Sequence, residues 1–341
     1  MSSKKPGSMD KDRRGPVRVA VLGIVTTMFL AAALAIGWRF ESDMAIAGTR
    51  AAQGSTLVAT RCGPIEYQEA GTGVPLLVVH GSGGGHDQGM AFAGAMAQQG
   101  IRVIAMSRFG YLRTPMPADA SPAAQADAHV CLLDALGVRQ AAVLGGSAGA
   151  PSATQMAIRH PGRTTALVLV VPLAYKPGTL ADSAPPASPP ASPLAQKMLA
   201  WLVGSDFLFW SGLHVARGQV TRNVLATSPD QLAAASPQEQ ARVDAIIDHI
   251  LPLSARAQGM RGDMAVATNL APYPLESIRA PTLIISARDD GFGTYANAQY
   301  TASRIAGSKF IGFEEGGHVL VGHDAEMQAA IVKLLKALAK P

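Results

Sequence analysis

The chain has 341 residues, of which 48% are hydrophobic, and it carries a formal net charge of +5. This length and composition suit one large α/β domain with a substantial core better than two small domains. Six lysines and arginines lie in the first eighteen residues and the rest of the chain is nearly neutral, so the charge does not indicate a nucleic-acid partner.

The N-terminal segment predicts a membrane anchor. Residues 1–18 form a basic leader, and residues 19–38 contain no charged side chain. Twenty helical residues span about 30 Å, the hydrocarbon thickness of a bilayer. The positive-inside rule keeps the leader in the cytoplasm and places the chain after Arg39 on the extracytoplasmic side, which is the periplasm in a bacterium.

A cleaved signal peptide is the alternative to an anchor, because Ala45-Ile46-Ala47 fits a small-x-small cleavage site. A cleaved leader would release a secreted protein, so both interpretations place the folded domain outside the cytoplasm. Residues 39–55 are expected to be a tether, and residues 56–341 the folded domain. Its two cysteines, Cys62 and Cys131, fall in a hairpin and in a helix interior that need not meet. We therefore expect buried thiols in preference to a disulfide.

The first half of the domain alternates between predicted strands and helices. Residues 56–70 alternate around the turn signal Gly63-Pro64 and predict a hairpin. Apolar runs predict strands at 75–80, 101–106, 140–144 and 166–171, separated by helices at 90–99, 121–136 and 150–160. This alternation predicts a mostly parallel sheet with helices on both faces.

The alternation stops after Pro172, and residues from about 174 to 272 are expected to form a helical insertion, or lid. The insertion opens with a proline-rich loop at 177–193. Its predicted helices are 194–203, 207–217 and one that starts at Ser236-Pro237-Gln238-Glu239. Strands return at 281–286 and 309–313, and a helix at 325–339 closes the chain.

The sequence Gly145-Gly146-Ser147-Ala148-Gly149 joins a predicted strand to a predicted helix. In a G-x-S-x-G nucleophile elbow the serine occupies a strained, exposed turn, and the two outer glycines let the strand and helix pass closely. Ser147 is therefore the candidate nucleophile. It needs a base, an acid that orients the base, and donors for an oxyanion.

Two of the eight histidines lie beyond the last predicted strand, His318 and His323. We expect His318 to be the base, because it follows two glycines in a loop able to reach the carboxyl edge of the sheet. The acid should follow the strand at 281–286, where Asp289 and Asp290 are adjacent. Asp290 is favoured; Asp289 is expected to pair with Arg288 or to cap the next helix.

The oxyanion donors are expected from two places. One is the Ala148 amide, at the start of the helix after the nucleophile. The other is the glycine-rich loop His80–Gly85, in which we favour Ser82 and then Gly83. The loop lacks the residues of a phosphate-binding motif. No metal-ligand cluster or cofactor motif is apparent, so neither a metal nor a cofactor is expected.

Together these motifs resemble the α/β-hydrolase superfamily over about residues 56–340, and they are similar to its capped esterases and carbon–carbon bond hydrolases. The resemblance implies that Ser147 attacks a carbonyl, that His318 carries the proton, and that Asp290 stabilises the imidazolium. Two positions depart from the family: Arg113 and Ala287 stand where glycine is common.

We therefore expect a serine hydrolase that cleaves small to medium lipophilic esters. The alternatives are a carbon–carbon bond hydrolase, an acyltransferase, a cofactor-free haloperoxidase-type enzyme, and a non-catalytic binding protein on the same fold. Trp201, Phe207 and Trp210 in the lid are expected to line an apolar substrate pocket, or else to pack the lid onto the domain.

Overall fold

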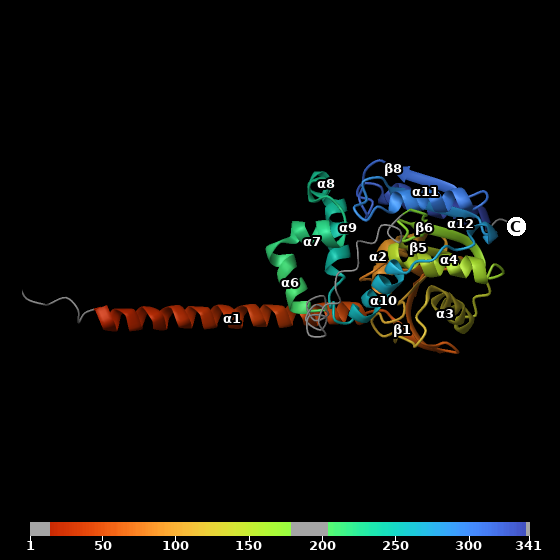
Figure 1. Ribbon diagram of the computed structural model, residues 1–341. Helices are drawn as coiled ribbons and strands as arrows, with labels where there is room; N and C mark the ends of the chain where they lie inside the picture. Colours follow the sequence, from red (N-terminus) through yellow and green to blue (C-terminus); the bar gives the residue numbers. More distant parts are fainter. Residues whose placement is uncertain (1–13, 179–203, 339–341) are drawn as a thin grey trace, which may run out of the picture. The chain divides into compact units, whose positions relative to one another are not determined.

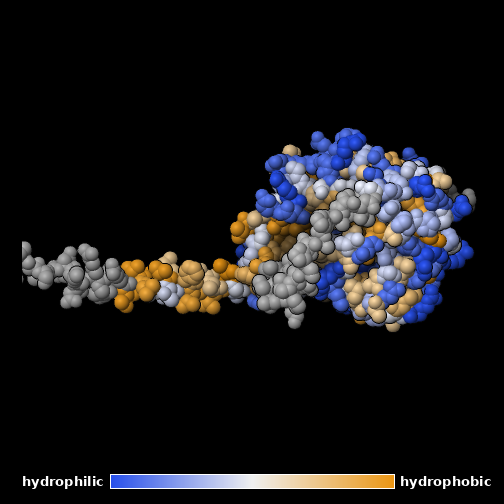
Figure 2. Space-filling view, in the orientation of Figure 1, coloured by the Kyte–Doolittle hydropathy of each residue, from blue (hydrophilic) through white to orange (hydrophobic). Residues whose placement is uncertain are grey.

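The computed structural model describes residues 14–178 and 204–338 (Figure 1). The chain divides into two compact units, residues 1–46 and residues 47–341. Helix α1 (Arg14–Ala52) supplies the first unit and extends into the second. The apolar side chains of its described first part are exposed, as the orange stretch in Figure 2 shows. This helix is long and apolar enough to cross a membrane, and a signal sequence passes the same test.

The second unit is built on one eight-stranded sheet in the order β1-β2-β4-β3-β5-β6-β7-β8. The pairs β1–β2 and β2–β4 are antiparallel, and the other pairs are parallel. All the predicted strands are present, with bounds β1 Thr56–Thr60, β2 Gly63–Ala70, β3 Val74–Val79, β4 Ile101–Met106, β5 Ala141–Gly146, β6 Thr164–Val170, β7 Thr282–Ala287 and β8 Lys309–Phe313.

Helices cover both faces of the sheet, as predicted. Successive residues of a strand point to opposite faces, so Leu77 and Val79 join one core cluster and Leu76 and Val78 the other. The first cluster includes residues of α3 (Pro122–Ala135), α4 (Ala150–Arg159) and α11 (Thr294–Arg304). The second includes residues of α2 (His86–Ala93), the 3₁₀ helix η1 (Gly94–Gln99) and α12 (Asp324–Leu338).

The insertion between β6 and β7 contains short helices, grouped in green and teal in Figure 1. They are α6 Asp206–Val215, α7 Arg217–Val224, α8 Pro229–Ala234, α9 Pro237–Asp248 and α10 Ala257–Thr268, followed by the 3₁₀ turn η3 Leu275–Ser277. The start signal predicted for α9 is present, because the Ser236 hydroxyl accepts from the Glu239 amide at 3.3 Å. The predicted helix 194–203 lies outside the described residues.

The segment expected to be a tether is helical as far as Ala52. Its last turn belongs to the second unit, where Ala47 and Ala51 are buried. The Arg50 guanidinium donates to the carbonyls of Asp248 and Leu251, at 2.8 and 2.9 Å. Apolar burial and these charged hydrogen bonds keep residues 47–52 ordered against the domain.

The expectation of two free thiols is wrong, because Cys62 and Cys131 form a disulfide with their Cα atoms 6.0 Å apart. The two positions are 69 residues apart in sequence. Helix α3, which carries Cys131, packs against β1, so the β1–β2 turn with Cys62 lies beside it. This packing depends on sheet topology, which the local sequence patterns around each cysteine do not reveal.

Candidate functional site

Ser147 occupies a sharp turn between β5 and α4, within the 3₁₀ turn η2 (Ser147–Gly149). Its φ of 47° lies in the left-handed region that non-glycine residues rarely adopt. A Cβ on Gly149 would lie 2.4 Å from the Val79 carbonyl oxygen, and one on Gly145 would lie 2.7 Å from the Cβ of Ala153. The two outer glycines therefore permit the close approach of strand and helix that the motif predicts.

The structure brings Ser147, His318 and Asp290 into one hydrogen-bonded chain. His318 Nε2 lies 2.9 Å from the Ser147 hydroxyl, and His318 Nδ1 lies 2.8 Å from Asp290 Oδ2. The serine and histidine are 171 positions apart in sequence. This geometry allows the imidazole to take a proton from the hydroxyl while the carboxylate fixes its tautomer.

Asp290 is buried and held by two further donors. The Phe292 amide donates to its Oδ1 at 2.9 Å, and the Thr294 hydroxyl makes a short hydrogen bond to Oδ2. Three donors thus satisfy a carboxylate that burial would otherwise penalise. Thr294, the first residue of α11, has no counterpart among the residues predicted from the sequence.

Asp289 was expected to pair with Arg288 or to cap the next helix, and its hydrogen bonds are different from both. Its carboxylate accepts from the amides of Gly316 and Gly317, at 3.2 and 2.8 Å, in the loop just before His318. Both glycines have positive φ, 134° and 59°. Arg288 pairs with Glu314 instead. The two adjacent carboxylates therefore divide the work: one binds the imidazole and the other holds the loop that carries it.

The backbone of His318 has a partner in the lid, since its amide donates to the Thr227 hydroxyl at 3.1 Å. The Phe292 ring and the imidazole form a T-shaped pair, with the ring centroids 4.8 Å apart. His323 lies away from this chain of residues, stacked on Phe313 at 3.8 Å. The structure thus selects His318 between the two candidate histidines.

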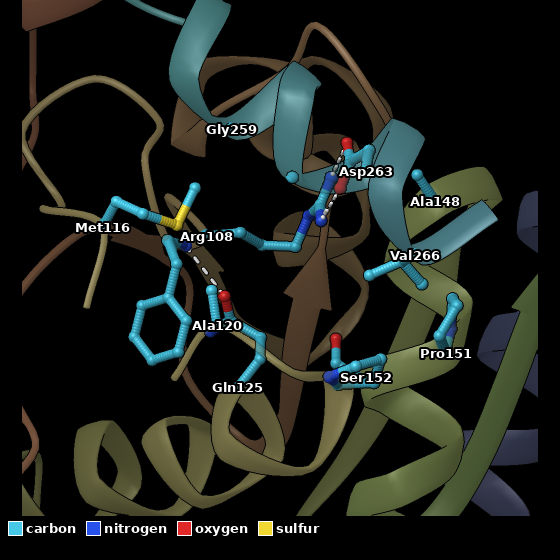
Figure 3. Close-up of a pocket in the computed structure, with 13 residues that line it drawn as sticks. Arg108, Met116, Ala120, Gln125, Ala148, Pro151, Ser152, Gly259, Asp263 and Val266 are labelled. Carbon is cyan, nitrogen blue, oxygen red and sulfur yellow. Dashed lines mark hydrogen bonds and ion pairs between the residues drawn. The ribbon is translucent and has the colours of Figure 1, made fainter. Parts of the chain in front are cut away.

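The predicted oxyanion loop lies against the serine. A Cβ on Gly81 would come within 3.2 Å of the Ser147 Cβ, and both Ser82 and Gly83 line the cavity that holds Ser147. The Gly83 amide donates to the Tyr111 hydroxyl at 3.4 Å, which commits it in part. Ala148 follows the serine directly and borders a smaller, separate pocket (Figure 3).

His80, at the start of this loop, is a buried neutral side chain. Burial lowers its pKa well below the ordinary value, and the nearby Arg108 charge acts in the same direction. Its Nε2 accepts from the Arg108 amide at 3.0 Å, so its Nδ1 proton donates to the Gly81 carbonyl at 2.7 Å. His80 therefore shapes the loop and does not compete with His318 as a base.

A cavity of about 590 Å³ opens beside Ser147 and His318. Apolar side chains supply most of its wall, from the sheet and core helices (Val78, Phe92, Leu144, Val170, Met327) and from the lid (Val224, Leu225, Ala245, Ile246, Ile250, Met260). This size and character suit a small to medium apolar ligand.

The aromatic residues predicted to line the pocket do not do so where the structure describes them. Phe207 and Trp210 are absent from the wall of the cavity and stack on each other within α6, with their ring centroids 5.9 Å apart. One turn of helix separates them, which makes them neighbours on the helix surface. Trp201 lies outside the described residues. Residues of α7, α9 and α10, with the residues that directly follow α7 and α9, supply the lid side of the wall instead.

The part of the chain that the structure describes contains no group of three or more His, Cys, Asp or Glu side chains able to hold a metal. Arg113 stands where glycine is common in the family, and it has a structural role. The Arg113 guanidinium donates to the buried Glu66 carboxylate at 2.7 Å. Ala287 is the buried last residue of β7 and leaves the Asp290 pairing intact.

Comparisons with known proteins concern the fold of the chain. A family model described as the alpha/beta hydrolase fold matches residues 74–324. A 2-hydroxymuconate semialdehyde hydrolase of Pseudomonas putida is 40% identical over 105 residues, which are 30% of this chain and only 37% of that protein.

Solved structures match over more of the chain. An alpha/beta hydrolase fold protein from Nakamurella multipartita superposes with a TM-score of 0.63 and 28% identity, covering 83% of this chain and 99% of its own. A bacterial membrane phospholipase A superposes with a TM-score of 0.62 over 95% of this chain and 100% of its own. At 19% identity, this second likeness concerns the fold alone.

Proposed function

Because the chain belongs to the α/β-hydrolase family, we propose that it is a serine hydrolase that cleaves small to medium lipophilic esters through an acyl-enzyme. The observation that carries this proposal is the hydrogen-bonded chain of Ser147, His318 and Asp290 at the wall of an apolar cavity. Family membership alone leaves the substrate open.

In the proposed mechanism the Ser147 hydroxyl attacks the ester carbonyl while His318 Nε2 takes its proton. Asp290 stabilises the imidazolium, and backbone amides at Ala148 and in the loop Ser82–Gly83 stabilise the oxyanion. His318 then gives the proton to the departing alcohol. A water molecule then gives a proton to His318 and attacks the acyl-enzyme, and the acid leaves as Ser147 takes the proton back.

The charges on the cavity wall favour a neutral substrate. Arg242 is the one lysine or arginine among the described residues that line it. Its guanidinium binds the Glu239 carboxylate and donates to the Val319 carbonyl at 2.8 Å. Burial alone would raise the pKa of Glu239, but hydrogen bonds from Arg242 and the Gly322 amide lower it overall. The ionised Glu239 therefore neutralises the cation that could otherwise attract an anionic substrate.

Carbon–carbon bond hydrolysis is the second candidate, because the matched Pseudomonas putida relative is a 2-hydroxymuconate semialdehyde hydrolase. Its substrate is a carboxylate by name. The pairing of Arg242 with Glu239 argues against this candidate. A substrate carboxylate buried in the cavity would need a free cation or several hydrogen-bond donors.

The two candidates are separated by one set of assays. We expect turnover of p-nitrophenyl esters with neutral acyl chains, no turnover by Ser147→Ala, and fluorophosphonate labelling that the same substitution abolishes. Turnover of 2-hydroxymuconate semialdehyde with no activity on any ester would favour the second candidate. Glu239→Gln supplies a matched test, because freeing Arg242 should raise activity on an acidic ester, such as a monosuccinate, relative to its neutral counterpart.

We also propose that α1 anchors the protein in a membrane with residues 53–341 on the extracytoplasmic side. The long exposed apolar helix, the basic leader and the disulfide between Cys62 and Cys131 support this location. Protease treatment of spheroplasts, in which the periplasmic side is accessible, should degrade the catalytic domain and spare a tag on the N-terminus. An N-terminus at residue 48 in the mature protein would indicate a cleaved signal instead.

A further inference from the structure

The proposed oxyanion loop is bound to the lid through a buried carboxylate, Asp263 of α10. Asp263 accepts two hydrogen bonds from the Arg108 guanidinium, at 2.6 and 2.8 Å, and one from the Tyr111 hydroxyl at 2.5 Å. Figure 3 shows the paired Arg108 and Asp263 between the end of β4 and helix α10. The arginine and the carboxylate are 155 positions apart in sequence.

Both partners of Asp263 in turn contact the loop. The Arg108 guanidinium donates to the His80 carbonyl at 2.9 Å and to the Gly81 carbonyl at 3.2 Å. The Tyr111 hydroxyl accepts from the Gly83 amide at 3.4 Å and lies 3.5 Å from the Ser82 hydroxyl. Every residue from 80 to 83 therefore has a contact to a side chain that Asp263 binds.

Burial makes these contacts sensitive to the charge of Asp263. Tyr111, Arg108 and Asp263 are only 0%, 6% and 8% exposed. A buried guanidinium without its carboxylate is a strongly unfavourable charge, and it would shift to find other acceptors. The His80 and Gly81 carbonyls are the acceptors that Arg108 already contacts.

Close packing fixes α10 against the same group. A Cβ on Gly259 would lie 2.1 Å from the Tyr111 ring, so the helix backbone rests directly on that side chain. The Gly259 amide also donates to the Gly110 carbonyl at 2.9 Å. Helix α10 is therefore closely packed on Tyr111 and hydrogen-bonded to Gly110 at this point.

We propose that Asp263 is a positioning residue for the oxyanion hole, acting through Arg108 and Tyr111 on the loop from His80 to Gly83. This inference rests on the proposed function of Ser147. The carboxylate touches no reacting atom in the proposed mechanism. Its effect is to keep the loop amide donors at the distance that the transition-state oxyanion requires.

A second contact between lid and loop does not involve Asp263. The fully buried Arg256 donates to the Gly84 carbonyl at 2.7 Å and pairs with Asp87 at 2.7 Å. It holds the far end of the loop independently of Asp263.

The test compares Asp263→Asn with the wild type by steady-state kinetics on p-nitrophenyl butyrate and by the rate of fluorophosphonate labelling at Ser147. We expect kcat and the labelling rate to fall by about 10–100-fold with KM changed less than about threefold, since the lost interaction acts on the oxyanion. Inhibition by a trifluoromethyl ketone, which forms a tetrahedral adduct with the serine, should weaken by a similar factor.

Two variants serve as controls. Asp244→Asn removes a lid carboxylate that pairs with Arg217 away from the loop, and it should leave all three measurements unchanged. Tyr111→Phe removes the hydrogen bond from the Tyr111 hydroxyl to Asp263 and keeps the Arg108–Asp263 pair, so it should give a smaller loss of kcat. If Asp263→Asn does not fold, Tyr111→Phe is the variant that tests the proposal.

The proposal would be overturned if folded Asp263→Asn had the kcat, labelling rate and ketone inhibition of the wild type. If only Tyr111→Phe folds, the same result in that variant would overturn it. So would a loss that appears in KM and not in kcat. Wild-type protein that is labelled at Ser147 but cleaves no ester would refute the ester substrate, and the labelling rates would still decide the role of Asp263. Absence of labelling in the wild type would refute both.

Discussion

Two neighbouring carboxylates show how much chemistry depends on the direction of a single side chain. Asp289 and Asp290 follow the same strand, yet one accepts backbone amides from Gly316 and Gly317 and the other accepts from the His318 imidazole. Only Asp290 can stabilise an imidazolium directly. Asp289 acts on the position of the loop.

Asp290→Asn and Asp289→Ala should therefore differ greatly in their effects on turnover. The side-chain amide introduced by Asp290→Asn would favour the wrong histidine tautomer, so we expect kcat to fall by roughly 10⁴-fold. Loss of Asp289 frees two loop amides without removing the acid, and a fall of roughly tenfold is expected. The measurement is kcat on one p-nitrophenyl ester for both variants. Equal losses would contradict this division of tasks.

His129 gives a second prediction at this scale, because burial lowers its pKa to about 3. Its Nε2 lies 3.1 Å from the Ser152 hydroxyl. The unfolded chain binds a proton near pH 6.5, whereas the folded chain does so only near pH 3. The stability that depends on neutral His129 is therefore complete above pH 6.5 and falls as the pH drops towards 3.

The free energy of unfolding should be measured from pH 7.5 to 4.5 for the wild type and for His129→Asn. The advantage of the wild type should be constant above pH 7 and shrink below 6.5 by up to about 1.4 kcal/mol per pH unit. A difference that does not vary with pH would show that His129 is not held neutral by the fold.

At the scale of elements, the sequence predicted best those parts in which burial leaves a regular pattern. The strands of the parallel sheet are short apolar runs such as Leu76–Val79, since both faces are covered by helices. The elbow was predicted because the Ser147 turn needs glycine at two fixed positions. The base and acid then followed from chain order along the sheet.

The elbow glycines supply a matched pair of variants. Gly149→Ala should destabilise the protein by several kcal/mol, because the new methyl would meet the Val79 and His80 carbonyl oxygens at 2.4 and 2.6 Å. Gly146→Ala should change stability by less than about 1 kcal/mol, since its methyl would have no neighbour within 4 Å. Urea unfolding of both variants tests this; similar losses would mean that the elbow is less tightly packed.

Contacts between elements that are distant in the chain could not be predicted from the sequence. The pairing of Cys62 with Cys131 depends on where α3 packs, and the pairing of Arg108 with Asp263 depends on how the lid returns to the sheet. Neither partner carries a local signal for the other. The wall of the cavity is not predicted for the same reason: α6 carries Phe207 and Trp210, whereas residues of α7, α9 and α10 line the cavity.

At the scale of the whole molecule, one helix takes part in both compact units. Large apolar side chains between Val19 and Ile46 are exposed, and from Ala47 the same helix is part of the catalytic unit. The Ala51 carbonyl accepts from the buried His86 at 3.0 Å, just after the oxyanion loop, and Arg50 holds the chain that leaves α9. The end of α1 is therefore structural support for the site as well as a connection.

Two shortened chains separate these roles. A chain beginning at Ala47 retains Arg50 and Ala51, so it should keep the kcat of the full protein within about twofold. A chain beginning at Gln53 loses both contacts and leaves His86 without its carbonyl acceptor. We expect it to lose roughly 2–4 kcal/mol in the free energy of unfolding, on the scale of a few buried or charge-assisted hydrogen bonds.

Urea unfolding measures the stability of both shortened chains, and ester turnover measures their kcat. Arg50→Met in the full chain should reproduce part of the loss of stability. If both shortened chains were equally stable, residues 47–52 would be only a connection, and the catalytic unit would begin at β1.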